Sequence, residues 1–162
     1  MIFTQTGNEE DLKDKLKELV LLPGEEVYIP VYNRQRKYGG EYRIVSRPLF
    51  PGYLFYETER VGDLRERLRK ITDFKRLLSF DGDIIPLSAD EEILLYKLCG
   101  KEHVLDVSTG YREGDRVRVI RGPLMGMEAN IKKVNRHKRI AVIEIEMFNR
   151  TMELVVGLEV IY

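Results

Sequence analysis

The chain has 162 residues, 43% of them apolar and 33% charged, a balance typical of globular rather than disordered proteins. Its longest apolar run, residues 19–22, is far too short to cross a bilayer, and no secretion signal is recognisable. Cys99 is the only cysteine, so an internal disulfide is excluded and we expect a cytoplasmic protein without a membrane partner. The formal net charge is zero, but residues 111–162 contain 10 Lys/Arg against 7 Asp/Glu.

The first thirty residues show one helix pattern between two strand patterns. Residues 3–6 predict a strand, and the turn that follows leads into an acidic first helical turn, which suits the helix dipole. Leu12, Leu16 and Leu19 have the spacing of an amphipathic helix that ends before Pro23. Residues 27–32 predict the second strand.

A basic hairpin is predicted next. Gly39-Gly40 lies between two arms rich in Lys and Arg, and paired glycines favour the tight turn of a hairpin. The basic residues of the arms are Arg34, Arg36, Lys37, Arg43 and Arg47, against a single acid, Glu41. Such a segment is either a solvated charged surface or an electrostatic site for nucleic acid.

The segment from Arg47 to Phe55 combines two prolines with three aromatic residues. Pro48 and Pro51 bracket Phe50 and keep the backbone extended, so this stretch cannot be helical. Gly52 then leads into a strand rich in aromatic residues, in which Tyr53 and Phe55 share one face. We expect Phe50, held between the prolines, to be exposed.

Residues 63–71 and 88–98 have helical spacing, and the second of these opens with the capping-box pattern Ser88 to Glu91. Residues 74–80 and 84–85 predict short strands between the two helices. The resulting order of elements predicts an α+β fold, an antiparallel sheet covered by helices. Residues 101–110 have weak periodicity and are expected to form a linker.

From residue 111 onward, every apolar segment is short and strand-like, which predicts a small five-stranded barrel. Val117 and Val119 alternate with arginines, as in a half-buried strand with a basic outer face. A denser basic group flanks Val134-Asn135, the expected position of a turn. This group consists of Lys132, Lys133, Arg136, His137, Lys138 and Arg139.

Two of these motifs, in this order, resemble the NusG family of transcription elongation and antitermination factors. Residues 47–55 resemble the proline-aromatic segment of its amino-terminal (NGN) domain, and residues 114–126 resemble the start of its KOW module. Within the family, the LoaP type of antiterminator is most similar. The segments that carry this finer resemblance are residues 5–10, 136–139 and 157–160. Two departures are the missing Trp-Tyr pair near the start and Ala129, where KOW modules generally have glycine.

The resemblance implies a ferredoxin-like NGN domain over residues 1–100, a linker over 101–110 and an SH3-like KOW barrel over 111–162. It also implies that the NGN domain binds the clamp helices of RNA polymerase through Phe50, Pro51, Tyr53 and Phe55. Alternatively, Tyr53 and Phe55 belong to the core, as aromatic strand residues usually do. The hairpin residues Arg34, Arg36, Lys37 and Arg43 match a region that lies near upstream DNA in the family.

For the KOW barrel the resemblance implies one of two partners. A LoaP-type barrel binds a nascent RNA hairpin and promotes readthrough of terminators, whereas the barrel of a general factor binds a ribosomal protein or Rho. The basic charge favours RNA, because cations neutralise phosphates and arginines can also contact guanine edges. The residues expected to bind RNA are Lys132, Lys133, Arg136, His137, Lys138 and Arg139, with Arg116, Arg118 and Arg121 of the earlier strand. A solvated basic loop without a ligand is the alternative.

An enzyme is disfavoured. No Cys/His spacing for a metal, no phosphate-cradling loop and no activated nucleophile is recognisable. Asp81 and Asp83 flank Gly82 and indicate a turn rather than a catalytic carboxylate pair. We therefore expect a monomer with no cofactor, no metal and no catalytic residues.

Overall fold

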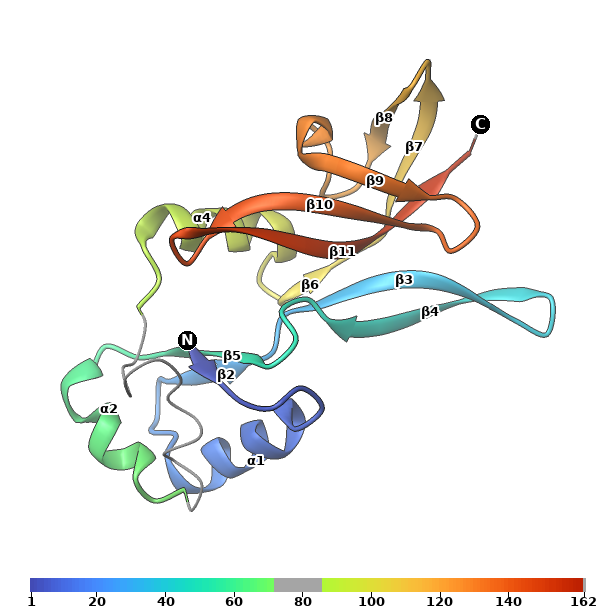
Figure 1. Ribbon diagram of the computed structural model, residues 1–162. Coiled ribbons are helices and arrows are strands. Elements are labelled where there is room, and N and C mark those ends of the chain that lie inside the picture. The colour runs from blue at the N-terminus through green and yellow to red at the C-terminus, as the bar shows by residue number, and fades with distance from the viewer. Residues whose placement is uncertain (72–85, 162) are drawn as a thin grey trace. The chain divides into compact units, whose positions relative to one another are not determined.

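The computed structural model describes residues 1–71 and 86–161, and the chain forms two compact units (Figure 1). Unit 1 comprises Met1–Pro30 and Phe50–Leu87, and unit 2 comprises Val31–Leu49 and Ser88–Tyr162. The units reflect packing and do not follow chain order. They leave the predicted domain boundary at residues 101–110 untested.

In its described residues, unit 1 is a small antiparallel sheet with two helices on one side (Figure 1). Its strands, in the order in which they pair, are β1 (Ile2–Phe3), β5 (Tyr53–Glu57) and β2 (Glu26–Tyr28). Its helices are α1 (Glu9–Leu19) and α2 (Val61–Leu68). Leu12 and Leu16 of α1 and Leu64 and Leu68 of α2 are buried, as the helical spacing predicts. Burying these apolar side chains is the main force that holds the helices to the unit.

The predicted strand 27–32 is divided in the structure. It ends as β2 at Tyr28, and a new strand, β3, begins at Val31 in a different sheet. Pro30 lies between them and has no N–H group with which to continue a ladder, which explains the break. The predicted strands 74–80 and 84–85, and the predicted turn at Asp81 to Asp83, lie outside the described residues.

Unit 2 contains the predicted basic hairpin, one helix and a five-stranded sheet (Figure 1). The hairpin strands are β3 (Val31–Tyr38) and β4 (Glu41–Pro48), and the short β6 (Val104–Leu105) pairs with β3 in parallel. Gly39 and Gly40 both have positive φ at the hairpin tip, as predicted. The predicted linker, residues 101–110, is partly β-structure: it contains β6 and the beginning of β7 at Ser108.

The sheet of the barrel follows in the order β8-β7-β11-β10-β9. Its strands are β7 (Ser108–Glu113), β8 (Arg116–Arg121), β9 (Ile131–Asn135), β10 (Ile140–Met147) and β11 (Arg150–Val160), with the 3-10 turn η1 (Glu128–Asn130) between β8 and β9. Alternate residues of β10 and β11 fill its core, among them Ile143, Leu154 and Val156. The predicted α+β fold followed by a small barrel is confirmed.

The helix α4 (Ala89–Cys99) precedes the barrel and begins with the predicted capping box. The Ser88 hydroxyl accepts from the Glu91 backbone, and the Glu91 carboxylate accepts from the Ser88 backbone. The same carboxylate also accepts from the backbone N–H of Phe148, in the turn between β10 and β11, at 2.6 Å. The Glu91 carboxylate thus takes part in the N-terminal cap of α4 and also links this helix to the barrel.

A buried ion pair joins α2 to the loop before β2. The Glu25 carboxylate receives two hydrogen bonds from the Arg67 guanidinium, at 2.7 and 2.8 Å, and further ones from Tyr56 and Thr58. The side chains of Glu25 and Arg67 are 6% and 11% exposed. The Arg67 guanidinium holds the pKa of Glu25 well below its ordinary value although burial opposes it, and burial together with Glu25 raises the pKa of Tyr56 to about 12.

We predict that Glu25→Gln lowers the free energy of unfolding of unit 1 by about 3–5 kcal/mol at pH 7. It removes the buried counter-ion of Arg67 and leaves the guanidinium only the more exposed Asp63, at 3.3 Å. Since the folded-state pKa of Glu25 is depressed, its contribution exists above the unfolded pKa of about 4.3 and is lost as pH falls below it. The difference between wild type and variant should therefore shrink below about pH 4.3. Urea unfolding of both proteins at each pH, followed by the NMR resonances of Leu54 and Phe55, measures this difference in the free energy of unfolding.

The matched control is Glu66→Gln, which removes an exposed carboxylate on the same helix, paired with Arg69 at 2.9 Å. Its effect should stay within about 0.5 kcal/mol. Equal effects of the two substitutions would contradict the assigned importance of the buried pair.

Candidate functional site

Aromatic side chains gather on the face of the unit 1 sheet that carries Tyr53 and Phe55. Phe3 pairs directly with Tyr53, and Tyr28 pairs directly with Phe55, so all four share this face. The ring centroids of Phe3 and Tyr53 are 5.2 Å apart, and those of Tyr28 and Phe55 are 5.7 Å apart. Leu54 points to the opposite face and is fully buried. We call Phe3, Tyr28, Tyr53 and Phe55 the aromatic face.

The predicted exposure of Phe50 is wrong. Phe50 is only 1% exposed, and its ring packs against Phe55 with the centroids 5.6 Å apart. The reason is a tight turn in which the Tyr53 N–H donates to the Phe50 carbonyl at 3.0 Å, with Pro51 and Gly52 at the corner. The corner residue Pro51 is exposed, Tyr53 is half-buried, and Phe55 belongs to the core.

The turn is fixed from both sides. Gly52 has φ +85°, and a Cβ there would lie 2.8 Å from the Thr4 carbonyl oxygen, so glycine is required. Its N–H donates at 2.7 Å to the buried carboxylate of Glu9, which also accepts from the N–H of Gly7. Because these contacts connect residues some forty positions apart, local sequence pattern could not have shown how they direct Phe50 inward.

Sequence reasoning missed Phe3 and Tyr28 as members of the aromatic face. Both lie on strands whose register with β5 decides which side chains face each other. The available signal was an aromatic residue in each of the predicted strands 3–6 and 27–32. That signal becomes specific only when the pairing is known.

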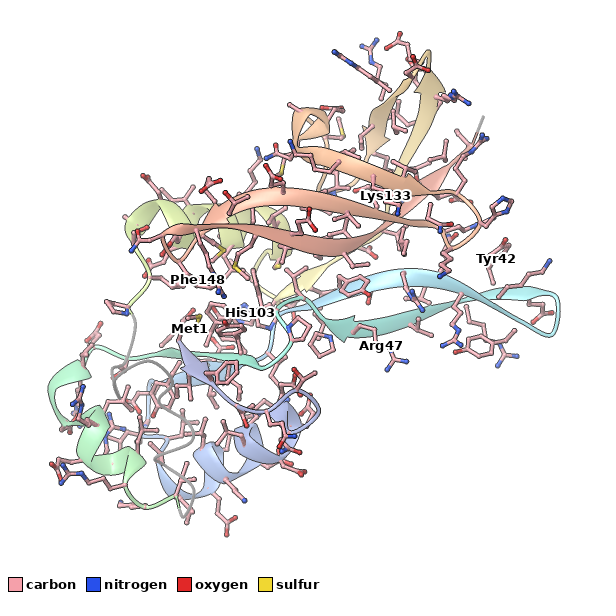
Figure 2. All side chains as sticks on the ribbon, in the orientation of Figure 1. Met1, Tyr42, Arg47, His103, Lys133 and Phe148 are labelled. Carbon is pink, nitrogen blue, oxygen red and sulfur yellow. The ribbon has the colours of Figure 1, made fainter. Side chains whose placement is uncertain are left out.

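The basic hairpin presents two different faces. Arg34, Arg36 and their cross-strand partners Val45 and Arg43 share one face, on which Arg47 also lies. Figure 2 shows the side chains of Tyr42 and Arg47 on opposite sides of the hairpin. We call the side with Arg36, Arg43 and Arg47 the arginine face.

The predicted basic turn of the barrel is displaced from its expected position. Val134 and Asn135 belong to β9, where they pair with Ala141 and Ile140, so the prediction of a turn at these two residues is wrong. The turn is formed by residues 136–139. The Asn135 side chain accepts from the Lys138 backbone at 2.9 Å, which closes the turn just after the strand.

The structure brings most of the predicted RNA-binding cations of the barrel together. Lys132 and Lys133 lie exposed on β9, and Arg136, His137 and Lys138 lie exposed in the adjoining turn. Lys132 is 3.5 Å from Glu144, whereas Lys133, Arg136 and Lys138 have no ion-pair partner among the residues that the structure describes. We call Lys133, Arg136, His137 and Lys138 the basic turn cluster.

Arg139 is separated from that cluster by its contacts. It is half-buried, and its guanidinium donates to the Glu159 carboxylate at 2.8 Å and to the Gln35 side chain of β3. The same guanidinium lies over the Tyr42 ring, 3.5 Å from its centroid. These contacts turn the donors of Arg139 toward the protein, and its predicted role in binding RNA stays a prediction.

The arginines of β8 form a separate group. Arg116, Arg118 and Arg121 are exposed, as the alternation with Val117 and Val119 predicts. However, β8 is at one edge of the five-stranded sheet and β9 at the other, with three strands between them in the pairing order. Ala129, the departure from the KOW pattern, lies in η1 without a positive φ and therefore without strain.

Across residues 1–71 and 86–161, no group of three His, Cys, Asp or Glu residues is placed to hold a metal ion. In the same residues, no helix is long and apolar enough to cross a membrane. Burial raises the pKa of the Cys99 thiol to about 12, so this thiol is protonated at neutral pH and is not a reactive nucleophile.

Comparison with known proteins identifies the family of the chain. Residues 1–94 match the family described as "Transcription termination factor nusG", and residues 113–146 match the KOW motif. The NusG transcription termination/antitermination protein of Thermus thermophilus is 29% identical over 148 residues, which cover 86% of this chain and 76% of that protein. The proteins of the same name from Halalkalibacterium halodurans and Campylobacter jejuni are 23% and 21% identical, over 93% of this chain and 89% and 88% of their own lengths.

The matched segments define a transcription factor of the termination and antitermination class, with an amino-terminal NusG region followed by a KOW module. The chain belongs to the NusG family. Membership in a family of transcription factors agrees with the expectation that the protein is not an enzyme.

We predict that Phe50→Ala lowers the free energy of unfolding of unit 1 by about 3–5 kcal/mol, because it leaves a cavity beside Phe55. The exposed aromatic Tyr38, which is 42% accessible, provides the control, and Tyr38→Ala should change stability by about 0.5 kcal/mol at most. Chemical denaturation of the two variants makes the comparison. A Phe50→Ala protein as stable as wild type would show that this ring is solvent-exposed after all.

Proposed function

We propose that this protein is a specialised antitermination factor that binds RNA polymerase through unit 1 and a nascent RNA hairpin through its barrel, and so promotes readthrough of terminators. The observation that carries the proposal is the basic turn cluster. Several exposed cations lie within seven successive residues of one turn and its strand, and three of them lack an ion-pair partner in the described parts of the chain.

The aromatic face supports the polymerase contact. Phe3, Tyr28 and Tyr53 are half-buried, so part of each ring is accessible, and Pro51 is exposed beside Tyr53. Aromatic side chains that are apolar on one side and polar at the tip are typical of protein interfaces. Phe50 and Phe55 act beneath them as a packed support that fixes their positions. The polymerase clamp helices would then contact Pro51, Tyr53 and Phe3 rather than Phe50.

The basic turn cluster suits a structured RNA. Lys133, Arg136 and Lys138 can neutralise phosphates, while the planar guanidinium of Arg136 can also donate two hydrogen bonds to a guanine edge. A double-helical RNA stem offers phosphates on both strands within the span of one turn, whereas a single strand offers them along one line. His137 contributes a ring able to stack on an unpaired base.

The arginine face of the hairpin supports a weaker contact with upstream DNA. Arg36 and Arg43 are directly paired across the strands and Arg47 lies on the same face, so three cations can follow a phosphate backbone. Arg34, also predicted here, is half-buried and less available, and Lys37 lies on the opposite face with Tyr42. Phosphate contacts of this kind position a protein without reading sequence.

A general elongation factor is the second candidate function. It is favoured by two exposed apolar side chains of the barrel, Ile120 at 46% and Met125 at 52%. Exposed apolar side chains near the β8 end of the barrel offer a contact for a protein such as Rho or a ribosomal protein. In that case the basic turn cluster is a solvated surface.

We predict that wild type increases readthrough of an intrinsic terminator only when the leader RNA contains its hairpin. Tyr53→Ala should abolish most of this effect, because loss of an interface aromatic commonly costs about 2 kcal/mol or more, roughly thirtyfold in affinity. Tyr96→Ala, at a tyrosine that is 59% exposed on α4, is the control and should behave as wild type. A run-off transcription assay decides. Readthrough that is independent of the hairpin selects the general factor.

We also predict that replacing Lys133, Arg136 and Lys138 together by alanine weakens binding of the RNA hairpin. If each side chain neutralises one phosphate, the slope of log affinity against log salt should flatten by about two to three units. The measurement is hairpin binding by the full-length chain over a salt series. A control variant replaces three exposed lysines elsewhere, Lys15, Lys17 and Lys70, and should keep the wild-type slope.

If wild type binds the RNA hairpin and a single-stranded RNA of equal length with the same affinity, the barrel does not recognise structured RNA. An unchanged slope in the triple variant would place the RNA on another surface, for which the β8 arginines are the next candidates.

A further inference from the structure

The hairpin β3–β4 has little to hold it in place by itself. A two-stranded hairpin is marginally stable in water, and most residues of its outer half, from Arg36 to Ile44, are exposed. Arg36 is also paired directly with Arg43, and like charges opposite each other are destabilising. Its order therefore depends on contacts outside the two strands.

Part of that support is at the base of the hairpin. Val31 and Tyr32 of β3 pair in parallel with Val104 and Leu105 of β6. The Asn33 side chain then donates to Asp106 at 3.2 Å and accepts from Ser46 at 2.6 Å, which ties both hairpin strands to the segment leading into the barrel. These contacts leave the outer half of the hairpin unsupported.

Arg139 supplies the second contact, farther along the hairpin. Its guanidinium bridges Glu159 of β11 and Gln35 of β3 and covers the ring of Tyr42 of β4. One barrel side chain thus contacts both hairpin strands, and Glu159 balances its charge. Arg139 has φ +50°, an uncommon conformation for a residue with a side chain, which the surrounding contacts must maintain.

Gly157 supplies the third contact and is the most specific. It is buried in β11, and a Cβ at this position would collide with the backbone carbonyl of Asn33 in β3. Its own φ is not positive, so the strand conformation does not require glycine. Glycine is needed here only because the hairpin backbone approaches β11 so closely.

We infer that β11 and the turn before β10 form a docking surface for the chain's own β3–β4 hairpin, so that hairpin and barrel behave as one rigid body in the free protein. Arg139 and Gly157 are its positioning residues. Docking turns the side of the hairpin with Gln35 and Tyr42 toward the barrel and leaves the arginine face outward (Figure 2). The inference does not depend on RNA being the ligand of the barrel.

The test measures whether the hairpin stays beside the barrel in solution. A nitroxide is attached to Arg43→Cys on the outward face, next to Tyr42, in the full-length protein. The native Cys99 is 4% exposed and should remain unlabelled, which wild type treated in parallel verifies. Paramagnetic broadening of the backbone amides of residues 136–138 is then recorded, with the reduced label as reference. We expect strong broadening.

Gly157→Ala should reduce that broadening severalfold, because the added methyl group separates β11 from Asn33. Gly62→Ala is the matched control, since a Cβ at Gly62 meets nothing within 4 Å and its φ is not positive. It should leave the broadening unchanged. Tyr42→Ala provides a second disruption that cannot damage the barrel core, because Tyr42 is 44% exposed on the hairpin. It should reduce the broadening at least twofold.

The inference is overturned if wild type shows no broadening at residues 136–138, or if Gly157→Ala and Tyr42→Ala both retain the wild-type pattern. If Gly157→Ala does not fold, the Tyr42→Ala result decides alone. RNA is absent from every sample, so failure here leaves the proposed function of the basic turn cluster unaffected, and failure of RNA binding leaves this inference unaffected.

Discussion

The parallel pairing of β3 with β6 is the interaction on which the organisation of unit 2 depends. It joins residues 31–32 to residues 104–105 and so attaches the hairpin to the segment that begins the barrel three residues later, at Ser108. Without this short ladder, the Asn33 contact with Asp106 and the approach of Gly157 to β3 would have no fixed register. A two-residue ladder adds little energy itself, but it determines which later contacts are geometrically possible.

The candidate surfaces of the two units rely on different physical forces. The aromatic face of unit 1 offers apolar area, whose contribution to binding changes little with ionic strength. The basic turn cluster and the arginine face of unit 2 offer charge, whose contribution falls steeply as salt rises. A factor with both kinds of surface can hold a protein partner while its nucleic-acid contacts exchange.

Features set by neighbouring residues were predictable from the sequence. The capping box at Ser88, the glycine pair at the hairpin tip and the alternating strands of the barrel all appear as expected, because each depends on a few adjacent residues. The basic residues around 132–139 were also identified, since exposed cations are evident in the composition of a segment.

Features set by distant contacts were not predictable. Phe50 is buried because Glu9 and Thr4 hold Gly52 in a turn, and Arg139 is withdrawn because Gln35 and Tyr42 lie beside it. In both cases the deciding partner is more than forty residues away. The position of the turn after Asn135 was only partly predictable. A local hydrogen bond to the Asn135 side chain closes the turn, but the residue at which β9 ends is known only from its pairing with β10.

The division of the chain between the units has a consequence for synthesis on the ribosome. Residues 31–49 leave the ribosome early, yet the strand that completes their sheet, β6, follows more than fifty residues after the hairpin ends. The three strands described for unit 1 have all been synthesised once Glu57 has emerged. The edge of β3 that pairs with β6 therefore has no partner strand through much of translation, and dense charge of the kind this hairpin carries discourages the pairing of such an edge with other strands.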